Sequence, residues 1–109
     1  MLDFGANTIR LALKLNKTSV GRHIGKQLMR SATSAGANYE EACRAESRAD
    51  FIHKMQLTLK ELRETLYWLK LIEKSGLISS DHLKQLLNEA EELIRMVAKS
   101  VITAKANKK

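Results

Sequence analysis

The sequence predicts an all-α protein in which a single domain, spanning residues 1–109, is made of four amphipathic helices. Three observations support this fold class. Proline is absent and glycine occurs only 5 times among 109 residues, so few positions interrupt a helix. Aromatic residues make up only 5% of the chain, and no stretch alternates apolar and polar residues as a strand would. Apolar residues instead recur at spacings of three and four.

The first helix is predicted over residues 2–16 and the second over residues 20–45. The first has a helical repeat made of Leu2, Ala6, Ile9 and Leu13. Thr18 or Ser19 is expected to cap the second helix. The apolar seam of that helix consists of Leu28, Ala32, Ala35, Tyr39 and Ala42. Residues 31–38 are all small or polar and fit either helix or loop by propensity, and the unbroken seam favours helix.

The third helix is predicted over residues 48–74, after a capping box formed by Ser47 and Asp50. Seven apolar side chains fall within an arc of about 100° and are predicted to form its core face. They are Phe51, Ile52, Met55, Leu59, Leu62, Leu66 and Leu69. Leu57, Trp68 and Leu71 lie on nearly the opposite side. One bundle cannot bury both faces, so these three residues are a candidate interface between subunits.

The fourth helix is predicted over residues 80–104. Gly76 is a natural left-handed C-cap for the preceding helix, with Leu77 making the accompanying apolar contact. Ser79 or Ser80 then caps the fourth helix. Its seam consists of Leu83, Leu87, Ala90, Ile94, Val97, Val101 and Ala104. The basic tail over residues 105–109 is expected to fray. Short connections between four consecutive helices predict an antiparallel up-down bundle.

No set of residues suggests catalysis or metal binding. Asp50 and His53 have the spacing of one carboxylate and one imidazole in a di-iron helix, but a second such pair is missing. They are better interpreted as a cap residue beside a solvated histidine. The sequence has no glycine-rich phosphate loop, nucleophile elbow or cysteine and histidine cluster. We therefore expect no enzyme activity, no catalytic residue, no metal and no cofactor.

The chain is expected to be cytoplasmic, with no membrane partner. It has no apolar stretch long enough to span a bilayer, and its first residues do not form a secretory leader. Cys43 is the only cysteine, which excludes an internal disulfide and agrees with a reducing compartment.

The net charge is +7, and this excess is spread along the chain. Its most regular feature is a basic group on the first half of the second helix, made of Arg22, Lys26 and Arg30 with the bordering His23. Cations near a helix N-terminus oppose the macrodipole, so a compensating anion is expected. Nucleic-acid phosphates or an acidic neighbour from another helix or subunit would both serve. No aromatic residue interleaves with this group, so base stacking is not indicated there.

Three stretches of the sequence resemble the large-subunit ribosomal RNA intervening-sequence protein family. They are RSATSAGANYEEACRAESRADF (30–51), LKELRETLYWLKLIEKSGLIS (59–79) and EAEELIRMVAKSVITAK (89–105). The resemblance implies a bacterial four-helix bundle protein that assembles as a cyclic homopentamer, and it favours helix over residues 31–38. The chain departs from many relatives in having no proline before the second helix. The family is more distantly similar to accessory proteins of diversity-generating retroelements.

Two functional hypotheses follow. In the first, the protein is a non-enzymatic oligomer that binds RNA or DNA with little sequence specificity. The candidate nucleic-acid-binding residues are Arg22, His23, Lys26, Arg30, Lys105, Lys108 and Lys109. In the second, the protein is an oligomeric scaffold or accessory subunit whose partner is another protein.

Overall fold

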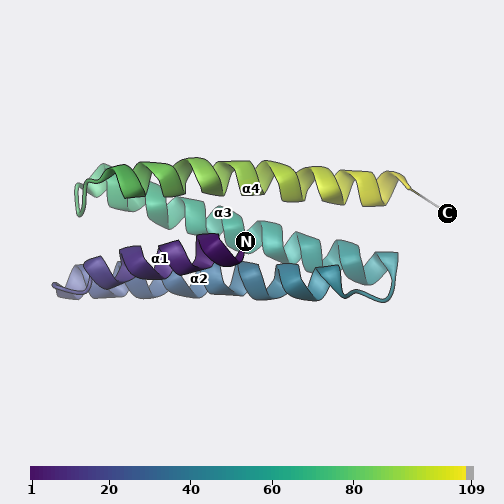
Figure 1. Cartoon of the computed structure of the whole chain (residues 1–109), viewed down its shortest axis with the longest axis horizontal. Helices are drawn as coiled ribbons and strands as arrows, with labels where there is room; N and C mark the ends of the chain where they lie inside the picture. The colour runs from purple at the N-terminus through teal and green to yellow at the C-terminus, as the bar shows by residue number, and fades with distance from the viewer. Residues whose placement is uncertain (108–109) are drawn as a thin grey trace.

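The computed structural model of the chain describes residues 1–107. These residues form four α-helices and no strand: α1 (Leu2–Lys14), α2 (Ser19–Cys43), α3 (Arg48–Ser75) and α4 (Asp81–Ala106). The all-α prediction is therefore confirmed. The helices run up and down along a body measuring 52 × 19 × 18 Å, and each packs on its neighbours around the bundle, with α4 closing back on α1 (Figure 1).

The predicted helix ends lie within two residues of those observed, because most are set by local capping. Thr18 accepts a hydrogen bond from the Gly21 amide at 2.9 Å, and Ser47 accepts one from the Asp50 amide at 3.1 Å. The reciprocal bond from the Ser47 amide to the Asp50 carboxylate does not form between these two described residues. Ser80 caps α4, and Gly76 ends α3 with φ of 70°.

The small residues over 31–38 are helical, as predicted. They belong to a long α2 whose buried side is made of Leu28, Ala32, Ala35 and Ala42. At the start of this helix, Gly25 allows α1 to come close: a Cβ there would lie 3.2 Å from the Ala12 carbonyl oxygen. Small side chains thus bring α1 and α2 together.

The apolar repeat that predicted α1 does not face the core. Leu2 and Leu13 are 85% and 67% exposed, and Ile9 is also exposed. The buried side instead contains Phe4, Thr8, Leu11, Ala12 and Leu15. Thr8 occupies a core position because its hydroxyl donates to the Phe4 carbonyl at 2.8 Å and leaves no unpaired polar group. Because a threonine interrupts this seam, its residues do not form an unbroken apolar repeat in the sequence.

The core face of α3 is rotated from the predicted one. Met55, Leu62 and Leu69 are buried as expected, but Phe51, Ile52, Leu59 and Leu66 are only half-buried. The other fully buried positions are Thr58, Thr65 and Ile72. Thr58 and Thr65 satisfy their hydroxyls on the carbonyls of Lys54 and Glu61, which lets threonine replace an aliphatic residue in the seam.

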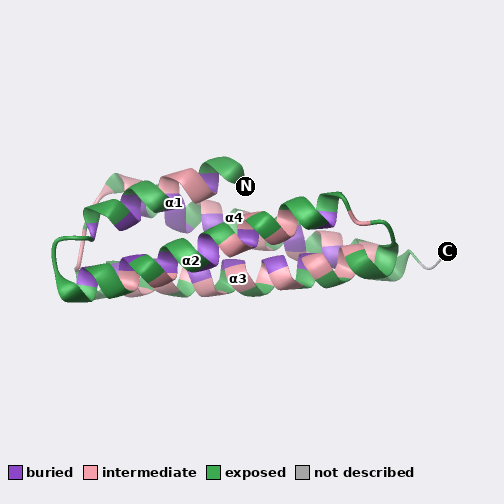
Figure 2. Cartoon of the chain, turned by 90° about the horizontal axis from the view of Figure 1, so that it is seen from below, coloured by how far each residue is buried: buried purple, intermediate pink, exposed green. Residues whose placement is uncertain are grey.

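The bundle is complete along only part of its length. Met1 lies beside Gly36, in the middle of α2, so α1 covers one half of the bundle and ends there (Figure 2). In the other half, α2, α3 and α4 pack with no fourth helix among the described residues. Phe51 and residues of α4 line an open hollow of about 420 Å³ there.

The end of α4 also differs from the prediction. The helix continues through Lys105 to Ala106, so the expected fraying of the tail is wrong for these residues. Lys108 and Lys109 lie outside the described residues. None of the helices in the described part of the chain has the length and apolar character needed to cross a membrane.

Candidate nucleic-acid interface

The α2 basic group consists of Arg22, His23, Lys26 and Arg30, and its first three members lie together at one end of the bundle. Arg22, His23 and Lys26 are exposed, and they rim an open hollow of about 460 Å³ between α1 and α2. Leu13 and Met29 contribute apolar groups to the same hollow. None of the three basic side chains forms a salt bridge within residues 1–107. This end of the molecule therefore presents cations beside an uncovered apolar strip.

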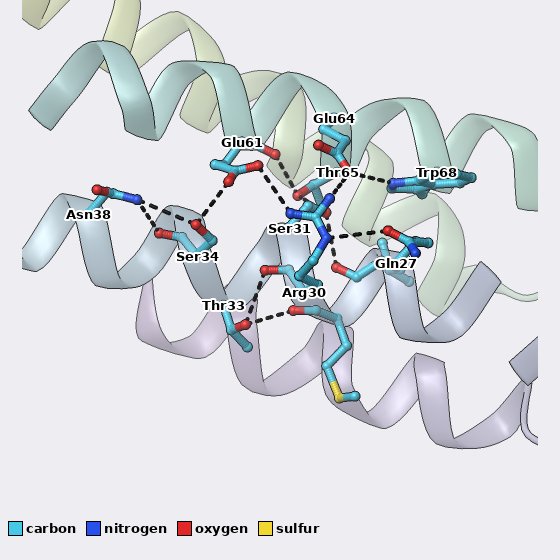
Figure 3. A network of polar contacts seen from close by, with 12 residues as sticks. Gln27, Arg30, Ser31, Thr33, Ser34, Asn38, Glu61, Glu64, Thr65 and Trp68 are labelled. Atoms are coloured by element: carbon cyan, nitrogen blue, oxygen red, sulfur yellow. Dashed lines mark hydrogen bonds and ion pairs between the residues drawn. The ribbon is translucent and has the colours of Figure 1, made fainter. Parts of the chain in front are cut away.

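Arg30, the fourth member of the group, faces α3 instead. Its guanidinium forms salt bridges with Glu64 and, at 3.7 Å, with Glu61 (Figure 3). Its Nε also donates to Gln27 at 3.3 Å. An acidic neighbour from another helix thus compensates this cation, which was one of the two alternatives that the sequence left open. Arg22 and Lys26 have no such compensation in the described part of the subunit.

The Arg30 contacts belong to a polar network that ties α2 to α3 (Figure 3). Glu61 accepts a hydrogen bond from the Ser34 hydroxyl at 2.9 Å. Beneath them, the buried hydroxyls of Ser31 and Thr65 meet at 2.9 Å. The contacts that cross between the helices form only when α2 and α3 are correctly aligned, so they favour this register.

Lys105 is not brought to the α2 basic group. Lys105 is exposed in the last turn of α4, whereas Arg22 and Lys26 lie in the first turns of α2, at opposite ends of the 52 Å body (Figure 1). One subunit therefore does not join Lys105 to the α2 basic group in a single site.

The candidate subunit interface is only partly covered. Leu57, Trp68 and Leu71 are all half-buried, on the flank of α3 nearer α2. Trp68 packs against the core edge, and its indole N–H donates to Glu64 at 3.1 Å. Leu71 lines an apolar hollow of about 210 Å³ with Val20, Ile24 and other residues. Val20, at 61% exposure, is the most open of the apolar residues here.

A second uncovered apolar surface lies on α1. It consists of Leu2, Ile9 and Leu13, three members of the apolar repeat that predicted this helix. The periodicity was real, but it marks the outer face of a short helix that is apolar on two sides. The repeat of Leu2, Ile9 and Leu13 does not by itself show which side of the helix is buried. The sequence also contains a second apolar series, Phe4, Leu11 and Leu15, and this is the buried one.

No metal centre is evident in the described chain. Nowhere in residues 1–107 do three His, Cys, Asp or Glu side chains lie close enough to hold an ion. Charge on Cys43 raises the pKa of Tyr39 above its ordinary value of 10.0, and a hydrogen bond with Cys43, burial and Glu40 add to the effect.

The fold and sequence are similar to those of known proteins. A crystal structure of a protein with unknown function from the S23 ribosomal protein family of Bacteroides thetaiotaomicron VPI-5482 superimposes with a TM-score of 0.70 at 31% identity, covering 90% of this chain and 97% of that one. No curated protein matches the chain. The family model described as 23S rRNA-intervening sequence protein matches residues 2–99. The chain therefore belongs to the 23S rRNA-intervening sequence protein family.

Proposed function

We propose that the protein is a non-enzymatic oligomer that binds RNA or DNA with little sequence preference through its basic surface. The observation that carries this proposal is the shortage of internal partners for its cations. Among the described residues, only Arg30 and Lys54 form salt bridges, although the chain has a net charge of +7. Unpaired cations spread over a surface attract phosphate backbones irrespective of base sequence.

The proposal includes self-association, because one subunit presents few cations in any one place and several copies would present more. One subunit has two different apolar surfaces that it does not fully cover. The first is made of the half-buried Leu57, Trp68 and Leu71 on α3, and the second of the exposed Leu2, Ile9 and Leu13 on α1. Pairing of two unlike surfaces, one on each copy, generates a ring when the rotation between neighbouring copies closes. The family resemblance suggests five subunits. A ring would repeat the α2 basic group around an axis, so that one polyanion meets it several times.

Assembly has a direct test in Trp68→Glu. The charge would be placed in the candidate interface, so we expect the native oligomer to dissociate while the helix content stays close to that of the native protein. Light scattering gives the mass and far-UV circular dichroism the helix content. Arg95→Glu, on the exposed side of α4, is the matched control. A native protein that is monomeric at tens of micromolar would contradict the proposal of an oligomer.

Binding by the α2 basic group can be tested with Arg22→Glu plus Lys26→Glu. Arg30 is left unchanged, because a glutamate there would face Glu61 and Glu64 and disturb the α2 to α3 contact. The control is Arg95→Glu plus Lys99→Glu, an exposed pair with the same spacing on α4. We expect the α2 pair to weaken binding of a labelled RNA at least about tenfold more than the control pair does. If both variants bind the RNA with equal affinity, the α2 basic group is not part of the nucleic-acid interface.

The same uncovered apolar residues favour a second candidate function, a scaffold that binds another protein. Exposed apolar surfaces commonly mark protein interfaces. The two functions differ in their response to salt, because phosphate contacts weaken steeply with ionic strength and an apolar interface does not.

A further inference from the structure

The outward side of α3 carries a regular row of exposed residues, called here the α3 outer row: Lys60, Arg63, Tyr67, Lys70 and Lys74. All five are exposed, and they follow one another in steps of three and four residues. That spacing keeps them on one side of the helix. From Lys60 to Lys74 the row extends about 21 Å, at about 1.5 Å per residue.

The row contains four cations and no acid. The acidic residues of this part of α3 are directed to its flanks: Glu61 and Glu64 bind Arg30 of α2, and Glu73 lies toward α4. Lys70 shares the rim of a hollow with Glu73 and Glu91. Even so, none of the four cations makes a salt bridge within the part of the chain that the structure describes. These four cations are therefore available to pair with the phosphates of an external ligand.

An aromatic ring stands in the middle of the row. Tyr67 is 58% exposed, and it meets Trp68 edge to face, with ring centroids 5.1 Å apart and planes at 74°. Trp68 is itself held by its hydrogen bond to Glu64, which in turn binds Arg30. Tyr67 is thus supported on one side by a fixed indole and open to solvent over more than half of its surface.

We propose that the α3 outer row binds a single-stranded nucleic acid, with a base stacked on Tyr67 and phosphates paired with the cations on either side. This inference rests on the proposed function, and it adds a surface and a strand preference to it. Cations that follow a backbone, combined with an exposed aromatic side chain, form the arrangement used for single strands without sequence specificity. In a duplex the bases are already stacked and paired, so Tyr67 would find no free base face.

The row does not compete with the candidate subunit interface. Leu57, Trp68 and Leu71 lie on the flank of α3 nearer α2, whereas the row faces outward. A ring built through that flank would leave the row open and place one copy beside each subunit boundary. A single strand could then follow rows on successive subunits.

The first experiment compares the native oligomer with Tyr67→Phe and Tyr67→Ser. Labelled oligo(U) and a duplex of the same length are titrated at one low salt concentration, and affinity is read from fluorescence anisotropy. We expect the native protein to prefer the single strand, Tyr67→Phe to bind like the native protein, and Tyr67→Ser to lose about 5- to 100-fold for the single strand only. Trp68 is the only tryptophan, so its emission should also change when oligo(U) binds to the native protein and to Tyr67→Phe.

The second experiment neutralises two cations of the row with Lys60→Gln plus Arg63→Gln, and Arg95→Gln plus Lys99→Gln on α4 is the control. The logarithm of affinity for oligo(U) is measured against the logarithm of salt concentration. Loss of two phosphate contacts should make the slope shallower by about 1.4 in the row variant and leave it close to native in the control. Light scattering on each variant checks its mass.

The outcomes separate this inference from the proposed function. If Tyr67→Ser and the Lys60 and Arg63 variant bind oligo(U) as the native protein does, the row is only a solvated helix face, while nucleic-acid binding by the native protein still stands. If Tyr67→Ser changes the mass of the oligomer, Tyr67 belongs to a subunit interface and the inference is overturned. If the native protein binds neither polymer at low salt, both the inference and the proposed function fall.

Discussion

Leu62 tests the assignment of the core face most sharply, because its side chain is 0% exposed in the middle of α3. Leu62→Ala removes buried methyl and methylene groups and leaves a cavity, and such changes cost about 2–5 kcal/mol. The neighbouring core residues Thr58 and Thr65 are held by hydrogen bonds to the preceding turn and cannot easily move into the space. We therefore expect a loss of about 3–5 kcal/mol in the free energy of unfolding.

Leu66→Ala is the matched control on the same helix. Leu66 is only half-buried, so the same truncation removes fewer contacts and opens a site that water can fill; we expect a loss of about 1–2 kcal/mol. Urea unfolding followed by far-UV circular dichroism measures both, at one fixed protein concentration because association affects apparent stability. Equal losses, or a larger loss at Leu66, would mean that the leucine arc and not the threonine-containing seam forms the core.

Two further predictions follow from the helices themselves. Gly36→Ala should stabilise the protein by about 0.5–1 kcal/mol, since a Cβ there meets nothing closer than Met1 at 3.9 Å and alanine is the better helix former. Gly21→Ala should destabilise it by about 1–3 kcal/mol, because a Cβ there collides with the Leu15 carbonyl oxygen. Thermal unfolding measures both changes in stability, and changes of the same sign would disprove these two predictions. The raised pKa of Tyr39 in the folded state contributes to the stability of the protein. This contribution is complete below about pH 10, the ordinary pKa, and is lost as the pH rises through the folded-state pKa of Tyr39. Cys43→Ala should lower that pKa in an ultraviolet absorbance titration, with Tyr39→Phe identifying the transition, and an unchanged curve would refute the role of Cys43.

The helices and their ends were predictable because their determinants are local. Thr18, Ser47 and Ser80 each cap a helix through a hydroxyl that the sequence displays, and Gly76 ends α3 in a conformation that favours glycine. The absence of proline, together with apolar spacing of three and four, was enough to establish the all-α class.

The core faces of α1 and α3 were less predictable, because polar residues occupy core positions. Thr8, Thr58 and Thr65 bury their hydroxyls by bonding to carbonyls one turn earlier, and a search for apolar repeats does not count them. On α1 the apolar repeat of Leu2, Ile9 and Leu13 lies on the outer face, and the buried face is also apolar. A search that accepts threonine at seam positions would have found Phe4, Thr8, Leu11 and Leu15.

The candidate site was predictable in part. The exposure of Arg22, His23 and Lys26 agrees with their helical spacing. The pairing of Arg30 with Glu61 and Glu64 was not evident, because it depends on how α2 and α3 align across the bundle. The α3 outer row was overlooked because its cations are separated along the sequence by core and flank residues, and its continuity appears only when burial is known.

The central claim, that the unpaired cations of this bundle bind nucleic-acid phosphates, is tested most directly by the salt dependence of binding. The native protein is titrated into labelled single-stranded RNA across a series of salt concentrations. Engagement of four or more phosphates predicts that the logarithm of affinity falls linearly with the logarithm of salt, with a slope of about −3 or steeper. No binding at low salt, or an affinity that does not change with salt, would contradict the claim.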